Sequence, residues 1–214
     1  MNYNIYEMFP KPLMVLEIDE HLQYKKILEK YYIDDVDESL RKKTNNNIFI
    51  FEDLKEIKKN IKKCCLQFYR NCCGFDVECE DIIINSSWFN IVNPNKFLYS
   101  HCHRNSHVSG VYYVSIDKIN HPPLIFEDRD EFIKSSINEA IFSLDYEIKT
   151  KYNANSFTYH PTEGEICLFK SDIWHGHFSN TTNEPRISLA FNSVLKTYNV
   201  GDKNAKSYKV NIEE

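Results

Sequence analysis

The part of the chain after Gly74 is a succession of short apolar or alternating segments, and this pattern limits the folds open to it. The segments are separated by Asn, Pro, Asp and Gly, which are turn-forming residues. Many short strands joined by turns indicate a sandwich or a barrel. The expected strands span residues 82–84, 88–92, 97–103, 109–116, 123–127, 144–149, 155–160, 164–169, 173–178 and 187–195. One helix is expected among them, over residues 130–141.

The chain before Gly74 has the apolar period of helices. After a short apolar run at residues 12–18, Asp19 is a candidate N-cap for a helix that reaches about residue 32. A loop over residues 34–47 precedes a second helix at about 51–73, which Gly74 would end. We therefore expect one domain over residues 1–214, mainly β with flanking helices. Its parts are helical support at 1–80, a β-rich core at 81–198 and a polar tail at 199–214.

Composition and charge exclude some partners and favour one compartment. A net charge of −5 argues against nucleic-acid binding, which needs a basic surface. The sequence has neither a signal peptide nor an apolar run of about 18 residues, so we expect no membrane contact. The adjacent pairs Cys64-Cys65 and Cys72-Cys73 recur on one helical face and are typical of core positions in a reduced, cytoplasmic protein.

Two histidines separated by one residue, His101 and His103, form the first candidate site. Side chains on a strand alternate between its faces, so both imidazoles would project from the same face and could reach one metal ion. Taken alone, this pair is equally consistent with two surface histidines. Further along, His175 lies in another expected strand. Arg186 and Ser188 then share a strand face, where a guanidinium and a hydroxyl could clamp a small carboxylate.

A series of short motifs follows between about residues 87 and 192. They read His101-Cys102-His103, Ser109-Gly110-Val111-Tyr112-Tyr113, Pro161-Thr162-Glu163-Gly164, His175 and Arg186-Ile187-Ser188-Leu189-Ala190-Phe191-Asn192, with Trp88-Phe89-Asn90 upstream. The series resembles the Fe(II)- and 2-oxoglutarate-dependent oxygenase superfamily. It is most similar to a group of oxygenases with His-x-His, Ser-Gly-Val-Tyr-Tyr, Pro-x-x-Gly, a lone His and Arg-x-Ser-x-x-Phe-Asn in this order. Any one motif is weak, but their order is a strong signal.

The resemblance implies a fold, cofactors and a reaction. The fold is a double-stranded β-helix, a jelly roll of two short sheets braced by the N-terminal helices. Fe(II) would bind in its mouth, with 2-oxoglutarate and O2 as cosubstrates. The enzyme would hydroxylate an unidentified substrate, a small molecule or a protein side chain, and release succinate and CO2. The implied metal ligands are His101, His103 and His175. The implied contacts to 2-oxoglutarate are Arg186, Ser188, Tyr113 and Asn90.

Position 103 departs from the superfamily, which usually has Asp or Glu there. A carboxylate would cancel one charge of the iron, whereas a third imidazole leaves Fe(II) at its full charge until 2-oxoglutarate arrives. The third ligand is therefore His103, which we favour, or a carboxylate such as Glu127 or Asp128. His177 shares a strand face with His175 and is the alternative distal ligand. The spacing to the downstream arginine favours His175.

Two other functions fit parts of the pattern. A cupin-type dioxygenase that does not use 2-oxoglutarate could hold its metal with His101, His103 and His107, but the later motifs would then lack a purpose. A non-catalytic β-helix module could bind a ligand or partner and keep the metal as a structural staple. The sequence does not determine the oligomeric state.

The remaining histidines and tryptophans have simpler interpretations. We expect surface positions for His107, His121 and His160, because they lie beside expected loops. We expect Trp88 and Trp174 in the barrel core rather than in contact with a ligand.

Overall fold

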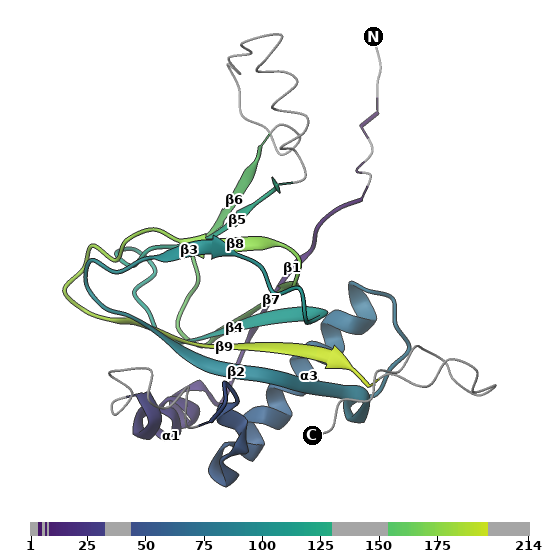
Figure 1. The fold of residues 1–214 in the computed structure, drawn as a ribbon, viewed down its shortest axis with the longest axis horizontal. Coiled ribbons are helices and arrows are strands. Elements are labelled where there is room, and N and C mark those ends of the chain that lie inside the picture. The colour runs from purple at the N-terminus through teal and green to yellow at the C-terminus, as the bar shows by residue number, and fades with distance from the viewer. Residues whose placement is uncertain (1–3, 6, 8, 33–43, 130–153, 197–214) are drawn as a thin grey trace.

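Two antiparallel sheets lie face to face, and the helices cover the outer side of the larger sheet (Figure 1). This computed structural model describes residues 4, 5, 7, 9–32, 44–129 and 154–196. The larger sheet has the order β1 (Leu13–Glu17), β7 (Glu165–Lys170), β4 (Val108–Ser115), β9 (Arg186–Leu195) and β2 (Ile82–Val92). The smaller sheet has the order β3 (Leu98–His101), β8 (Trp174–His177), β5 (Leu124–Glu127) and β6 (Ser156–Tyr159).

The helices form one hydrophobic core with the larger sheet. They are α1 (His21–Tyr32) and α3 (Lys55–Asn71), with the short 3-10 helices η1 (Ile48–Ile50), η2 (Glu52–Leu54) and η3 (Cys79–Asp81) beside them. The apolar period of α3 turns Ile61, Cys65 and Phe68 towards the sheet, where each is at most 2% exposed. All seven cysteines are free thiols, in agreement with the expected packing role of Cys65. The helices therefore cover the outer face of the larger sheet, whereas its inner face meets the space between the two sheets.

Strand β9 connects the core to the inner face of the sheet. Its ten residues are all buried, because one side of the strand meets the helices and the other meets the space between the sheets. Leu189 and Leu195 belong to the helix-side core, whereas Ser188 and Asn192 line a pocket on the opposite side. A second apolar cluster, which includes Tyr113, borders this pocket from the space between the sheets. The alternation along β9 thus places polar groups inside the molecule.

The mainly β architecture with flanking helices agrees with the sequence, but several boundaries differ. The expected strands at 82–84 and 88–92 are one strand, β2, with an irregularity between Ile84 and Ser86. The expected strand at 97–103 ends at His101. The expected helix at 51–73 is regular only over Lys55–Asn71. The helix at 130–141, the strand at 144–149 and the tail at 199–214 lie outside the described residues, and the division of the chain into support, core and tail stays a prediction.

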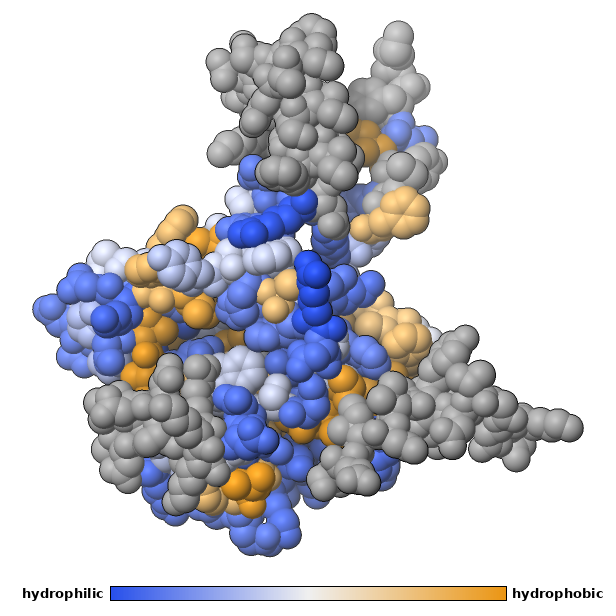
Figure 2. Space-filling model, viewed as in Figure 1, coloured by the Kyte–Doolittle hydropathy of each residue, from blue (hydrophilic) through white to orange (hydrophobic). Residues whose placement is uncertain are grey.

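The described surface on the face seen in Figure 2 is largely hydrophilic, with apolar side chains in separate patches. None of the helices in the described part of the chain combines the length and the apolar character that a membrane span requires.

Candidate functional site

His101 and His175 face each other across the β3–β8 pair. The register joins Leu98 to His177 and His101 to His175, so β3 contains one residue more than β8 in this interval. This irregularity lets Leu98 and His101, three positions apart, both line the pocket. Gly176 permits it, because a Cβ atom there would lie 2.7 Å from the Leu98 carbonyl oxygen. A glycine inside a strand thus marks the close approach that turns His101 inward.

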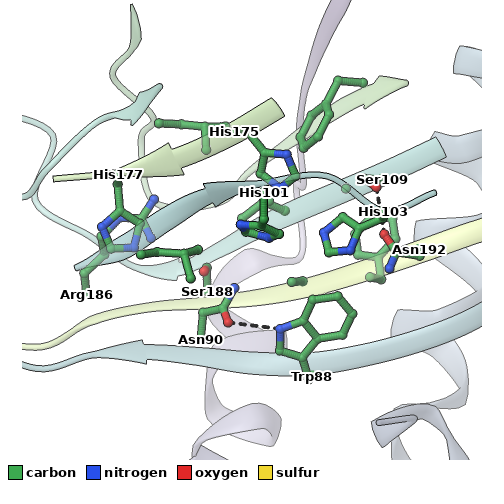
Figure 3. A pocket seen from close by; sticks show the side chains of 17 residues that line it. Trp88, Asn90, His101, His103, Ser109, His175, His177, Arg186, Ser188 and Asn192 are labelled. Carbon is green, nitrogen blue, oxygen red and sulfur yellow. Dashed lines mark hydrogen bonds between the residues drawn. The ribbon is translucent and has the colours of Figure 1, made fainter. Parts of the chain in front are cut away.

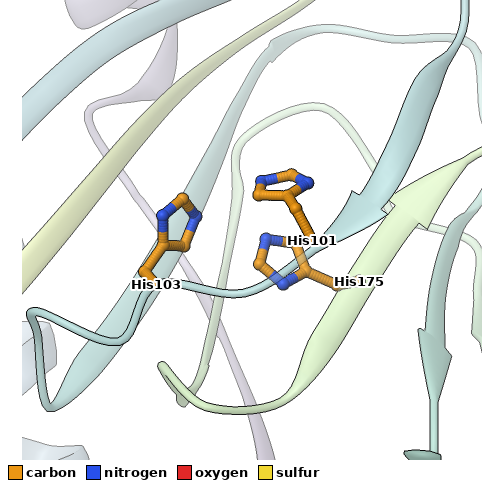
Figure 4. A group of neighbouring side chains, drawn as sticks. All are labelled: His101, His103 and His175. Atoms are coloured by element: carbon orange, nitrogen blue, oxygen red, sulfur yellow. The ribbon is translucent and has the colours of Figure 1, made fainter.

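His103 reaches the same point from the turn after β3. Its ring centroid lies 4.9 Å from that of His101 and 5.3 Å from that of His175, and the His101 and His175 centroids are 4.5 Å apart. One ring nitrogen from each residue lies within 4.8 Å of the others (Figure 4). The prediction that His103 lies on the strand is wrong, because β3 ends at His101. The side chains of His101 and His103 nevertheless converge, as expected. No other such group of His, Cys, Asp or Glu side chains occurs among the described residues.

The environment keeps the imidazoles of His103 and His175 neutral, which is the form that binds a metal. Burial lowers the pKa of His175 to about 3 and that of His103 to about 4, and the neighbouring imidazoles add to both shifts. The Nδ1 atom of His175 lies 3.0 Å from the Ile173 carbonyl oxygen, and that of His101 lies 2.9 Å from the Tyr99 carbonyl oxygen. A carbonyl only accepts, so Nδ1 carries the proton and Nε2 keeps its lone pair.

Arg186 contributes a buried positive charge beside the histidines (Figure 3). Arg186 is only 2% exposed, and this burial lowers the pKa of its guanidinium group. The guanidinium carbon lies 5.1 Å from the centroid of the Tyr113 ring. Among the described residues, Arg186 Nε, Ser188 Oγ, Tyr113 Oη and His177 Nε2 are buried without a hydrogen-bond partner. Buried polar groups are rarely left unpaired, so this cluster is suited to a ligand with several oxygen atoms.

The space around these groups amounts to about 390 Å³, a volume that includes solvent at the open mouth of the pocket. None of the described residues that line it is an acid. They are Trp88, Asn90, Leu98, His101, His103, Ser109, Gly110, Val111, Leu124, Phe169, His175, His177, Arg186, Ser188, Ala190, Phe191 and Asn192. Arg186 is therefore the one formally charged side chain among the described lining residues.

Trp88 belongs to the pocket and not to the core, so the expectation for this residue was wrong. Its ring centroid lies 5.6 Å from that of His103, and its Nε1–H donates a hydrogen bond of 3.0 Å to Asn90 Oδ1. The period of β2 explains both positions, because residues 88 and 90 share the inner face of the strand. Trp174 is also outside the core, since the Arg129 guanidinium stacks 3.7 Å from the centroid of its ring.

The alternative carboxylates are engaged elsewhere. Glu127 forms a 2.9 Å ion pair with Arg129, and Asp128 forms a 2.7 Å ion pair with Lys11. Neither acid lines the pocket or belongs to the histidine group. Glu127 and Asp128 therefore do not join the three imidazoles.

The three histidines expected at the surface divide into two groups. His107 and His160 are exposed, as expected. His121 is only 7% exposed, so that expectation was wrong. Its Nδ1 accepts a 2.8 Å hydrogen bond from the Asp117 amide, and its Nε2 donates one of 3.1 Å to the Glu184 carbonyl. His121 therefore has a structural role.

The two facing antiparallel sheets form a double-stranded β-helix. A family model described as "Putative 2OG-Fe(II) oxygenase" matches residues 86–192, which is half of the chain. The chain belongs to this family. The description of this family names Fe(II) and 2-oxoglutarate, in agreement with the motif series. A search of curated proteins gave no match.

Solved structures support the fold. HygX from Streptomyces hygroscopicus with iron bound matches with a TM-score of 0.55 at 12% identity, over 93% of this chain and 91% of HygX. EctD from S. alaskensis in its apoform matches with a TM-score of 0.53 at 14% identity, over 86% of this chain and 73% of EctD. The chain spans only about half of two other relatives, an oxidoreductase of Burkholderia pseudomallei (50%) and a prolyl-4-hydroxylase of Pseudomonas putida (51%).

Proposed function

We propose that the protein is an Fe(II)- and 2-oxoglutarate-dependent dioxygenase that hydroxylates an unidentified substrate and releases succinate and CO2. The observation that carries this proposal is the convergence of the three imidazoles beside a buried guanidinium that has no acidic partner among the described residues. Imidazole nitrogens suit a ferrous ion, and the guanidinium with its neighbouring hydroxyls suits a carboxylate. The residues present therefore fit both groups.

His101, His103 and His175 would hold the iron. The carbonyl groups of Tyr99 and Ile173 orient two of these rings by fixing the proton on Nδ1. When bound, iron together with 2-oxoglutarate supplies the activation of O2 that hydroxylation requires. His177 is less suitable as a ligand, because it is outside the converging group.

Arg186, Ser188 and Tyr113 would bind the far carboxylate of 2-oxoglutarate. Their unpartnered Nε, Oγ and Oη atoms all carry hydrogens to donate, and a carboxylate accepts from several donors at once. Asn90, on the inner face of β2, would contact the same cosubstrate from the side of Trp88. HygX, a structural relative with 11% identity and a TM-score of 0.50, has been solved with nickel and 2-oxoglutarate bound, which supports this use of the fold.

The substrate class that we propose is a small molecule or a protein side chain. Nucleic acid is not favoured, because the chain carries a net charge of −5. The cupin alternative lacks support, because His107 is exposed and is not part of the histidine group. Formation of succinate from 2-oxoglutarate, measured by chromatography, separates the two functions.

An anaerobic titration with Fe(II) and 2-oxoglutarate tests the proposal. The wild-type protein should develop the metal-to-ligand charge-transfer absorption band of a 2-oxoglutarate complex, and its absence would refute the proposed function. His175→Ala should abolish the band. His177→Ala is the matched control, since it removes an imidazole from the same strand, and it should keep the band. Loss of the band in both variants would mean that the distal ligand has been assigned wrongly.

A further inference from the structure

His103 is the least directly supported of the three imidazoles. The rings of His101 and His175 each face a carbonyl oxygen at 2.9–3.0 Å, which orients them. The ring of His103 makes only ring contacts among the described residues, with Trp88 and the other two imidazoles. It also lies past the end of β3, so no strand fixes its backbone. Its position must come from the way its main chain is held.

The turn after β7 holds that main chain. The His103 amide donates a 2.7 Å hydrogen bond to the Ser171 carbonyl, and the Ser171 amide donates one of 3.0 Å to the His107 carbonyl. The two turns are therefore connected in both directions. Ser171 is only 1% exposed, so its own amide and carbonyl groups are shielded from bulk water.

Side chains beneath the turn fix Ser171 in place. Ser109 Oγ lies 2.8 Å from Ser171 Oγ and 2.7 Å from Asn192 Oδ1. A hydroxyl has one proton, so Ser109 donates to the amide oxygen of Asn192 and accepts from Ser171. Asn192 Nδ2 then donates a 3.0 Å hydrogen bond to Ser86 Oγ. Ser109 and Asn192 are each 2% exposed and line the pocket beside His103.

We propose that Ser109, Ser171 and Asn192 are positioning residues that hold His103 at the distance from the other imidazoles that a metal requires. The inference rests on the proposed function, because it concerns the third ligand of the same metal. A chain of buried hydrogen bonds has one arrangement that satisfies all its members, and loss of one member leaves its partners unpaired. In the sequence, Ser109 begins the Ser-Gly-Val-Tyr-Tyr motif and Asn192 ends the Arg-x-Ser-x-x-Phe-Asn motif, although neither residue is a proposed metal ligand.

Cobalt(II) binding to the metal-free protein tests this inference without any turnover. Ser109→Ala should weaken Co(II) binding by about 10- to 100-fold, as removal of groups behind metal ligands does. It should also change the visible absorption of the bound Co(II), which reports the ligand set. Ser193→Ala is the matched control. Ser193 is equally buried in the same sheet, but its Oγ lies 3.2 Å from Tyr69 Oη on the helix side, so its loss should leave Co(II) affinity unchanged.

A double-mutant cycle assigns the effect to His103. In the His103→Ala background, Ser109→Ala should cause no further loss of Co(II) affinity, because the group that it positions is gone. A further loss, or equal weakening by Ser109→Ala and Ser193→Ala, would overturn the inference. If Ser109→Ala does not fold, Ser171→Ala interrupts the same chain from its other end and should give the same result. A wild-type protein that binds no Co(II) would instead refute the proposed metal site itself.

Discussion

Replacement of Arg186 by methionine should raise the stability of the ligand-free protein and lower its affinity for 2-oxoglutarate. Arg186 is 2% exposed, and no ion pair among the described residues includes it. Burial lowers its pKa, which means that the charged guanidinium is less stable in the ligand-free fold than in water. Methionine has a similar length and no charge, so Arg186→Met removes this penalty while filling much of the same space.

The expected magnitudes follow from the burial. Replacement of a buried ion pair by apolar side chains of similar volume is neutral or stabilises proteins by about 1–4 kcal/mol, and Arg186 has no acidic partner among the described residues to offset its burial. At this chain length, each kcal/mol corresponds to about 2–4 °C in Tm, so Arg186→Met should raise the Tm by several degrees. Loss of a buried charge-assisted contact costs about 2–5 kcal/mol in binding. The affinity for 2-oxoglutarate should therefore fall by about 30-fold to several thousand-fold.

Two measurements check the argument. Thermal unfolding without metal or 2-oxoglutarate gives the change in Tm, and calorimetric titration of the Ni(II)-loaded protein gives the 2-oxoglutarate affinity. Arg129→Met is the control, because this arginine stacks on Trp174 outside the pocket and should leave the affinity unchanged. A lower Tm for Arg186→Met would refute the reasoning on burial. An unchanged 2-oxoglutarate affinity would refute the proposed role of Arg186.

Three further predictions concern packing, pH and the third ligand. Gly110→Ala should destabilise the protein by about 1–3 kcal/mol in urea unfolding, because its Cβ would overlap the Phe191 ring and lie 2.8 Å from Leu168 Cδ2; no loss would contradict the packing. The folded pKa values of His103 (about 4) and His175 (about 3) lie below the unfolded value of about 6.5. The metal-free protein should therefore lose stability as the pH falls from about 6.5 to 4, by about 1.4 kcal/mol per pH unit for each imidazole, and equal urea midpoints at pH 7 and pH 5 would argue against neutral buried imidazoles. His103→Asp should keep the charge-transfer band with a shifted maximum, whereas an unshifted band would exclude His103 as a ligand.

Much of the fold was predictable because hydrophobic period and turn residues report strands and helices locally. The motif series also identified the family, and two of its members meet in space: Gly110 and Phe191 come from different motifs, and the ring occupies the volume that a side chain at 110 would need. The glycine and the phenylalanine are thus two halves of one packing contact between β4 and β9.

The errors arose where three-dimensional contacts override the local pattern. Strict alternation placed His101 and His103 on one strand face, but the strand contains an irregularity and ends between them. Gly176 was the available signal, since glycine within a strand suggests a close backbone approach. His121 carries no such signal, because its burial depends on the carbonyl of Glu184, which is distant in sequence. The Trp88 side chain is largely apolar but lines the pocket. Its hydrophobicity alone could not distinguish a position in the core from a position in the pocket.

Because β3 contains one residue more than β8, a deletion in β3 should compensate for a substitution at Gly176. Gly176→Ala should abolish metal binding, because the new methyl group would collide with the Leu98 carbonyl oxygen. Deletion of Ser100 would restore the regular ladder, in which the shortened strand still pairs His101 with His175. The same deletion would remove the crowding above position 176. A genetic selection that begins with Gly176→Ala should therefore return single-codon deletions in β3, a repair that substitutions at the three histidines cannot provide.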